Sequence, residues 1–313
     1  MRSICSMDTV QIEITNACNH SCGNCTRFCQ IVRKPYFMPL DDVKRAIDSM
    51  VGYPKMTGIM GGEPLLHPDF EEICRYAGSK ISANQLGLWT TLPKGFEKYN
   101  KVICKTFYNI FVNDHTRPDI FHQPPLVGIH EVCSDKNEMW QMIDRCWAQE
   151  SWSASVNPRG AWFCEIAASM SMLYEEGDGW PVESGWWWRT PKDFKEQIEQ
   201  WCPRCGFAAP LALRSSLEEI DDISTINYEA LNDKVRHPER LKIHPLTCVR
   251  ENPPMAAYKD LSYRNRIADR YGMFLVVNEM GFWTPYMKKG GEPTRPNKSI
   301  FDSLKERYQS CDI

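Results

Sequence analysis

Three cysteines at short, regular spacing are the residues whose chemistry stands out first. The segment EITNACNHSCGNC places Cys18, Cys22 and Cys25 at CxxxCxxC spacing, directly after a run that is typical of a β-strand. Cysteine thiolates are ligands of iron–sulfur clusters, and three ligands leave one iron of a four-iron cluster open to a small molecule. The alternative is a zinc site completed by Cys29 or His20, because paired cysteines are also common in structural zinc sites. The three cysteines alone leave both interpretations open.

A second motif, GIMGGEPLLHP, follows the next candidate strand and spans residues 58–68. Glycines at 61 and 62 let the backbone approach a ligand closely. Glu63 can pair with an ammonium group through a charge-assisted hydrogen bond. A zinc site needs none of these features, so the second motif favours the cluster.

Together the two motifs resemble those of the radical S-adenosylmethionine (SAM) superfamily, in which a CxxxCxxC loop follows the first strand and a GGEP motif follows the second. The resemblance implies that Cys18, Cys22 and Cys25 bind the SAM-binding 4Fe-4S cluster. It also implies reductive cleavage of SAM to a 5′-deoxyadenosyl radical, which abstracts a hydrogen atom from the substrate. The segment implied to hold the methionine amino group consists of Gly61, Gly62, Glu63 and Pro64.

Other positions match the family less closely. The residue before the third cysteine is usually aromatic in the family, whereas this chain has Asn24, which puts the adenine contact in doubt. Polar residues follow the third and fourth candidate strands, where the family places groups toward the ribose and carboxylate of SAM. Residues of these types also cap helices and close turns, so both roles stay open. They are Thr90, Thr91, Asn113 and Asp114.

Four further cysteines have the order of a second metal-binding set. Seventeen residues separate Cys146 from Cys164, thirty-seven separate Cys164 from Cys202, and Cys202 and Cys205 form CPRC. A helix end, a hairpin and a CxxC turn could bring four thiols together, as an auxiliary 4Fe-4S cluster requires. Zinc or plain buried thiols are the alternatives.

The order and spacing of this second set resemble the SPASM module of radical SAM enzymes and its shortened form, Twitch. Twitch fits better, because the next cysteine after the CxxC is Cys248. The arrangement is most similar to that of the radical SAM dehydrogenases that oxidise an aminocyclitol alcohol.

The elements that must position these cysteines alternate between β-rich runs and amphipathic helical patterns, as expected of repeated β/α units on a parallel sheet. This alternation predicts an α/β fold, and the resemblance implies a partial (β/α)6 radical SAM barrel with a small C-terminal auxiliary-cluster subdomain. The expected strands span residues 10–15, 55–60, 85–90, 108–113, 126–132 and 152–156. The expected helices span residues 40–50, 69–77, 96–106 and 136–147.

The predicted domain organisation has three parts. Residues 1–153 form the barrel, and residues 154–215 form the auxiliary-cluster subdomain, with Cys146 contributed from the preceding helix. The subdomain begins where Asn-Pro-Arg-Gly separates two β-rich runs, which is typical of a hairpin turn. Residues 216–313 form an extension whose role the sequence leaves open.

Candidate substrate residues are few. Arginine can clamp a phosphate or carboxylate with paired donors, and nearby tryptophans at 186–188 could stack on a substrate or simply pack the subdomain. Cys133 ends an expected barrel strand and is a candidate hydrogen-atom donor. The polar candidates are Arg159, Glu165, Glu183 and Arg189.

The predicted substrate is a small polar metabolite, oxidised by two electrons, one of which leaves through the auxiliary cluster. The alternatives are a redox-neutral isomerase or epimerase, modification of a peptide or of a nucleotide or nucleic acid, and an electron carrier without catalysis. Nucleic acid is disfavoured because the net charge is −3 over 313 residues. A carrier would not need the GGEP motif.

Composition indicates where the protein works and what it needs. The chain lacks a run of about 18 apolar residues and a secretory leader, so we expect no membrane partner and a cytoplasmic location. In a reducing compartment the 14 cysteines favour metal ligation over disulfides. The clusters also require a reducing partner such as flavodoxin or ferredoxin.

Overall fold

A mixed β-sheet forms the centre of the protein in a computed structural model that describes residues 1–113, 115–116, 120–151, 154–248, 273–277, 283–289 and 292–293. The strand order is β11-β12-β4-β3-β2-β1-β6-β7, and β13 pairs with β12. Five neighbouring strands are parallel: β4 (Asn109–Val112), β3 (Leu86–Thr90), β2 (Met56–Gly61), β1 (Thr9–Thr15) and β6 (Ala154–Asn157). The antiparallel strands are β7 (Gly160–Trp162), β11 (Met273–Val277), β12 (Trp283–Lys289) and β13 (Glu292–Pro293).

Strand β1 shows how the sequence builds this sheet. Its residues are all buried, as expected of a central parallel strand covered on both faces. Val10, Ile12 and Ile14 belong to the main apolar core, together with residues of the helix that follows. Because side chains alternate across a strand, Gln11 and Glu13 lie on the other face. The sheet therefore has an apolar helix-covered face and a partly polar inner face.

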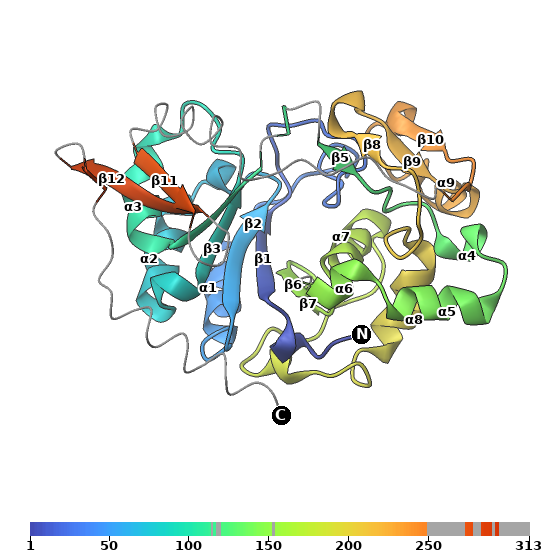
Figure 1. Cartoon of the computed structure of the whole chain (residues 1–313), viewed down its shortest axis with the longest axis horizontal. Coiled ribbons are helices and arrows are strands. Elements are labelled where there is room, and N and C mark those ends of the chain that lie inside the picture. Colours follow the sequence, from blue (N-terminus) through green and yellow to red (C-terminus); the bar gives the residue numbers. More distant parts are fainter. Residues whose placement is uncertain are drawn as a thin grey trace.

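Three helices cover the apolar face, α1 (Leu40–Ser49), α2 (Phe70–Lys80) and α3 (Asn100–Thr106). Figure 1 shows them together on one side of β1 to β3, whereas α4 to α9 lie on the other side. The α/β fold class is confirmed, with an open parallel sheet as expected for a partial barrel. The first four predicted strands and four predicted helices match observed elements, with ends shifted by a few residues.

The predicted fifth strand, residues 126–132, is wrong. Leu126 forms only an isolated bridge to Ile223, and the chain then enters the short helix α4 (Ile129–Val132). A short apolar run fits a strand and a buried helix equally well. Here Val127 and Ile129 pack in a separate apolar cluster with Met139 and Leu211 instead of joining the sheet.

The predicted sixth strand, β6, forms next to β1 and continues into the expected hairpin with β7. The remaining helices are α5 (Lys136–Asp144), α6 (Trp147–Ser151), α7 (Glu165–Tyr174), α8 (Lys195–Trp201) and α9 (Thr225–Leu231). Two small sheets pair β5 (Phe121–His122) with β8 (Arg214–Ser215), and β9 (Asp221–Ile223) with β10 (Leu241–Ile243).

Short 3-10 helices fill several connections: Ile4–Ser6, Pro64–Leu66, Ala83–Gln85, Glu97–Tyr99, Trp186–Trp188, Cys202–Arg204, Ser216–Glu218 and Pro238–Arg240. None of the described helices combines the length and apolar character needed to cross a bilayer.

Candidate functional site

The first cysteine set lies on a loop between the end of β1 and the start of α1. Hydrogen bonds close the base of this loop: the Thr15 hydroxyl donates to the Tyr36 carbonyl at 2.6 Å, and the Tyr36 N–H donates to the Asn16 side chain at 2.8 Å. Since β1 is parallel to its neighbours, the loop lies at the carboxyl edge of the sheet, where α/β folds place their reactive groups.

Four thiols of this loop are close neighbours. The Cys25 thiol has its pKa lowered to about 7, first because Cys29 hydrogen-bonds to it. Hydrogen bonds to Cys18 and Cys25, followed by burial, raise the pKa of Cys29. Burial and the charges of Cys25 and Cys18 raise the pKa of Cys22. Cys29 therefore lies against two of the three predicted ligands, Cys18 and Cys25.

The donor set fits an iron–sulfur cluster because three thiols of one loop can bind three irons and leave the fourth open. In the part of the chain that the structure describes, no three His, Cys, Asp or Glu side chains are grouped so that they could hold a metal ion. The thiols are thus neighbours without forming the ligand set of a single ion.

Changing Cys29 to Ala separates the two interpretations of the loop. If only Cys18, Cys22 and Cys25 bind the cluster, we expect C29A to retain the full iron content of the wild type, because Cys29 supplies hydrogen bonds and no ligand. Iron and zinc per chain, measured after anaerobic reconstitution, check this, with Cys104→Ala in α3 as the matched control. A variant that loses metal from the loop would favour a four-thiol site.

The two glycines of the GGEP motif bring the end of β2 against the cysteine loop. A Cβ added at Gly61 would lie 2.1 Å from the Thr15 carbonyl oxygen, and one at Gly62 would lie 2.4 Å from that of Ala17. The N–H groups of Gly62 and Glu63 donate to the same two carbonyls at 2.8 Å. The glycines are therefore required by the neighbouring backbone, which was not apparent from the sequence.

Glu63 connects the carboxyl ends of β2 and β3. Its side chain is fully buried and accepts four hydrogen bonds: from the N–H of Leu65 at 3.0 Å, the hydroxyl of Thr90 at 2.7 Å, and both the N–H and hydroxyl of Thr91 at 2.7 Å. Burial raises the pKa of Glu63, and these bonds oppose the rise. Its carboxylate is thus occupied within the chain, and a contact with the ammonium of SAM stays a prediction.

The other predicted SAM contacts lie at the same edge or outside the described residues. Thr91 is fixed by Glu63. Asn113, directly after β4, donates its N–H to the Thr90 carbonyl at 2.9 Å. Asp114 lies outside the described residues. Pro64 starts the 3-10 helix that ends the motif.

A buried ion-pair network extends from the cysteine loop to the inner face of the sheet. Arg27 contacts Glu13 of β1 at 3.1 Å and Glu165 of α7 at 2.8 Å, and it donates to Gln11 at 2.6 Å. Tyr36 donates to Glu13 at 2.8 Å. Burial raises the pKa of Glu13, whereas Arg27 lowers it. Glu165, predicted as a substrate residue, is therefore bonded to the cysteine loop.

Arg27 and Glu13 were not among the site residues predicted from the sequence. The alternation of Gln11 and Glu13 with Val10, Ile12 and Ile14 was the available signal, because it predicts a polar inner face for β1.

The second cysteine set is brought together from three segments. Cys146 lies between α5 and α6, Cys164 directly precedes α7, and Cys202 and Cys205 flank one 3-10 turn. All four line one pocket. Burial raises the pKa of Cys164 to about 12, with a further rise from Cys146, and burial also raises those of Cys202 and Cys205. The four predicted auxiliary ligands thus line one pocket, and their binding of a cluster stays a prediction.

The remaining substrate candidates do not converge. Arg159 in the β6–β7 turn pairs with Asp178 at 3.0 Å. Arg189 lies over the Trp180 ring at 4.7 Å, and its carbonyl accepts a hydrogen bond from the Ile4 N–H. Ile4 precedes β1, so Arg189 lies at the edge of the sheet opposite the cysteine loop. Glu183 is exposed.

Two further candidates have structural surroundings. Trp186 and Trp187 are buried and donate to Ser49 at the end of α1, in agreement with a packing role. Cys133 follows α4 instead of the barrel strand on which its predicted role depended, and its thiol donates to the Asp135 carbonyl at 3.3 Å.

His115 and His122 lie beside the cysteine loop, next to His20 of the loop itself, and the three were not predicted as a group. The ring of His115 is 6.2 Å from that of His20 and 5.0 Å from that of His122, measured between centroids. His122 donates to the Gly23 carbonyl at 2.7 Å. Burial, followed by the charges of His122 and His20, lowers the pKa of His115 to about 3. The central histidine is therefore neutral in the folded protein at pH 7.

We expect His115 to make the folded state less stable in acid. Its folded pKa lies below the unfolded value of about 6.5, so its contribution is complete above pH 6.5 and is lost as pH falls toward 3. Within that window the loss approaches about 1.4 kcal/mol per pH unit. Urea unfolding of the iron-free protein at pH 7 and pH 5 should show a smaller acid loss for His115→Asn than for the wild type. If the free energy of unfolding of His115→Asn falls between pH 7 and pH 5 as much as that of the control His237→Asn, this prediction is contradicted.

The comparisons with known proteins agree with the sequence motifs. Residues 12–106 match the model of the Radical SAM superfamily, a segment that runs from β1 to the end of α3 and includes Cys18, Cys22, Cys25 and the GGEP motif. No curated protein matches the sequence.

Two solved structures show a weak likeness. A crystal structure of BtrN in complex with AdoMet and 2-DOIA has a TM-score of 0.43 and 13% sequence identity, and covers 63% of this chain and 88% of its own. Selenomethionine BtrN in an open conformation has a TM-score of 0.39 and 11% identity, and covers 64% and 88%. Neither likeness bears on the substrate of this chain.

Proposed function

We propose that this protein is a radical SAM enzyme that oxidises a small polar metabolite by two electrons. When bound, SAM and its cluster would supply a 5′-deoxyadenosyl radical that abstracts a hydrogen atom from the substrate. The family match over residues 12–106 supports this chemistry, because the matched segment holds both the cysteine loop and the GGEP motif.

The observation that supports oxidation is the second set of thiols. Cys146, Cys164, Cys202 and Cys205 line one pocket, a donor set that suits a four-iron cluster with four protein ligands. Such a cluster would accept the second electron of an oxidation. We propose that a SPASM- or Twitch-type module formed by residues 154–215 holds it, with Cys146 contributed from the preceding segment. Residues 1–153 would form the SAM-binding part.

The chain's own residues give each part a defined task. Cys18, Cys22 and Cys25 would bind the SAM-binding cluster. The Glu63 hydrogen bonds hold the ends of β2 and β3 at the edge where SAM would bind. The ion pair between Arg27 and Glu165 joins the cysteine loop to the helix that starts directly after Cys164.

The working conditions follow from the same chemistry. A cytoplasmic location is part of this proposal, because its reducing conditions keep cysteines available as metal ligands. We expect a reducing partner such as flavodoxin or ferredoxin to supply the electron for SAM cleavage.

Two measurements test this function in sequence. Anaerobic incubation with dithionite and SAM should form 5′-deoxyadenosine without substrate, whereas an electron carrier would form none. With a matched substrate, the product should be two hydrogens lighter, and Cys202→Ala with Cys205→Ala should spare SAM cleavage but stop product formation. A product of unchanged elemental formula would reject oxidation in favour of an isomerase.

A further inference from the structure

The middle of the cysteine loop is held by a segment far along the chain. Residues 18–25 belong to no helix or strand, so their backbone depends on other contacts for its conformation. Those contacts come largely from residues 214–243, which contain β8, β9, α9 and β10. Figure 1 shows β8, β9 and β10 at the same end of the molecule as the loop after β1.

Asn24 makes a reciprocal pair of hydrogen bonds with Asp222 of β9. Its side-chain N–H₂ donates to an Asp222 carboxylate oxygen at 2.9 Å, and the Asp222 backbone N–H donates to the Asn24 side-chain oxygen at 2.7 Å. Asn24 is fully buried and Asp222 is 4% exposed. Arg214 holds the same carboxylate with two further bonds of 2.6 Å.

The backbone of the loop fits closely against this segment. Gly23 donates its N–H to the Ser216 carbonyl at 2.9 Å, and Asn24 donates to that of Ile220 at 3.1 Å. A Cβ at Gly23 would lie 2.7 Å from the Ile220 carbonyl oxygen. Asn24 has a φ of +50°, which asparagine tolerates better than aromatic residues do. These contacts account for an asparagine at a position that is usually aromatic in the family.

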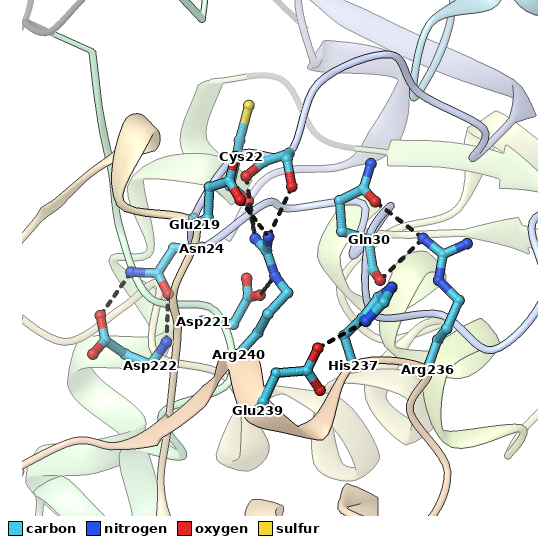
Figure 2. Close-up of polar contacts among 12 residues, drawn as sticks. Cys22, Asn24, Gln30, Glu219, Asp221, Asp222, Arg236, His237, Glu239 and Arg240 are labelled. Atoms are coloured by element: carbon cyan, nitrogen blue, oxygen red, sulfur yellow. Dashed lines mark hydrogen bonds and ion pairs between the residues drawn. The ribbon is translucent and has the colours of Figure 1, made fainter.

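Arg240 makes the second connection. Its guanidinium donates to the Ser21 hydroxyl at 2.9 Å, the Ser21 carbonyl at 3.2 Å and the Cys22 carbonyl at 3.0 Å. On its other side it donates to Asp221 at 3.1 Å, and Asp221 is 3% exposed. Figure 2 shows Arg240 between Asp221 and the Cys22 backbone. A buried charge is thereby paired and directed at the loop.

We propose that residues 214–243 form a clamp that sets the conformation of the cysteine loop, with Asp222 and Arg240 as its positioning residues. This gives a role to a part of the extension that the sequence left open. The contacts of the clamp require only the folded protein, whereas its effect on the cluster rests on the proposed function. Arg240 places a positive charge beside a predicted ligand, which favours the more reduced, more negative state of the cluster.

The first test uses the iron-free protein, so that it does not depend on the cluster. Asn24→Asp places two carboxylates face to face, and hydrogen exchange of peptides covering residues 18–30 should become at least about tenfold faster than in the wild type. Adding Asp222→Asn puts a donor opposite the new carboxylate, although it removes one acceptor of Arg214, and it should recover part of the protection. Rescue by this charge exchange is an effect that general destabilisation would not produce.

The second test measures the cluster potential. Arg240→Met should shift the reduction potential of the SAM-binding cluster to a more negative value. Arg240→Lys keeps the positive charge and should show a smaller shift. Lys242→Met removes the same charge from an exposed position on β10 and serves as the matched control.

The outcomes separate this inference from the proposed function. Loop exchange in Asn24→Asp that equals the wild type, or a potential in Arg240→Met that equals that of Lys242→Met, would overturn the clamp. If the wild type binds no SAM-cleaving cluster, the proposed function is wrong. The clamp is still supported if the double variant Asn24→Asp, Asp222→Asn recovers protection from hydrogen exchange.

Discussion

Replacing Cys18, Cys22 and Cys25 together by alanine is expected to abolish 5′-deoxyadenosine formation and to leave about four irons per chain. The reason is that the two thiol sets occupy different loops, and the second set lines a pocket of its own. The retained irons should therefore be bound by Cys146 and its three partners. Iron analysis and Mössbauer spectra of the reconstituted protein measure this.

Cys74→Ala is the control for the triple variant, because Cys74 is a buried core residue of α2 outside both sets. It should retain both the full iron content and SAM cleavage. A triple variant that loses all iron, beside a wild type with only four, would show that the second set binds no cluster. A zinc assay on the same samples separates an auxiliary zinc site from an auxiliary iron site.

Replacing Arg27 by methionine is expected to lower the free energy of unfolding by about 3–5 kcal/mol, because it leaves buried carboxylates without their partner. The side chains of Arg27, Glu13 and Glu165 are only 3%, 1% and 10% exposed. Such a loss is a large fraction of the roughly 5–15 kcal/mol by which domains are stable. Urea unfolding of the iron-free protein at pH 7 provides the measurement.

Two comparisons make the Arg27 prediction specific. Arg45→Met removes an arginine paired with Asp42 on the surface, and exposed pairs contribute only about 0–1 kcal/mol. Adding Glu13→Gln and Glu165→Gln to Arg27→Met should recover part of the loss, since no unpaired buried charge then remains. A loss in Arg27→Met no larger than in Arg45→Met would show that the network contributes little to stability.

The predictions for His115 and Cys29 concern the same cysteine loop as the clamp does. His122 donates to the Gly23 carbonyl, one residue before Asn24. The loop is thus held by the clamp, by Gln11 and Glu165 through Arg27, and by His122, which come from different parts of the chain. Low pH, the Asn24→Asp and Asp222→Asn pair, and Arg27→Met each change a different one of these contacts. Their effects on the loop can therefore be measured separately.

Local patterns in the sequence were sufficient to predict the cysteine loop, the GGEP motif and most helices and strands. Cys18, Cys22 and Cys25 lie within eight consecutive residues, so their spacing alone brings them to one loop. The strand and helix periods of residues 9–112 arise from alternation and from apolar residues three and four apart, which short-range geometry fixes. The β6–β7 hairpin depends on a turn of the same local kind.

Where the local pattern was ambiguous, the tertiary structure decided. Residues 126–132 carry an apolar run that suits a strand or a helix, and packing against α5 and Leu211 selected the helix α4. The role expected for Cys133 depended on that choice. Local pattern did not settle it, because periodicity alone does not distinguish a strand from a buried helix in so short an apolar run.

The partners of Asn24, Arg27 and Glu63 were likewise decided by the tertiary structure. Asn24 and Asp222 are separated by 198 positions, and Arg27 and Glu165 by 138. Glu63 is placed by the register of β2 on β3. Such contacts leave no periodic signal in one sequence, because a hydrogen bond between distant segments requires only that the fold bring them together. The sequence thus determined which residues could bind a cluster, whereas the fold determined what holds them in place.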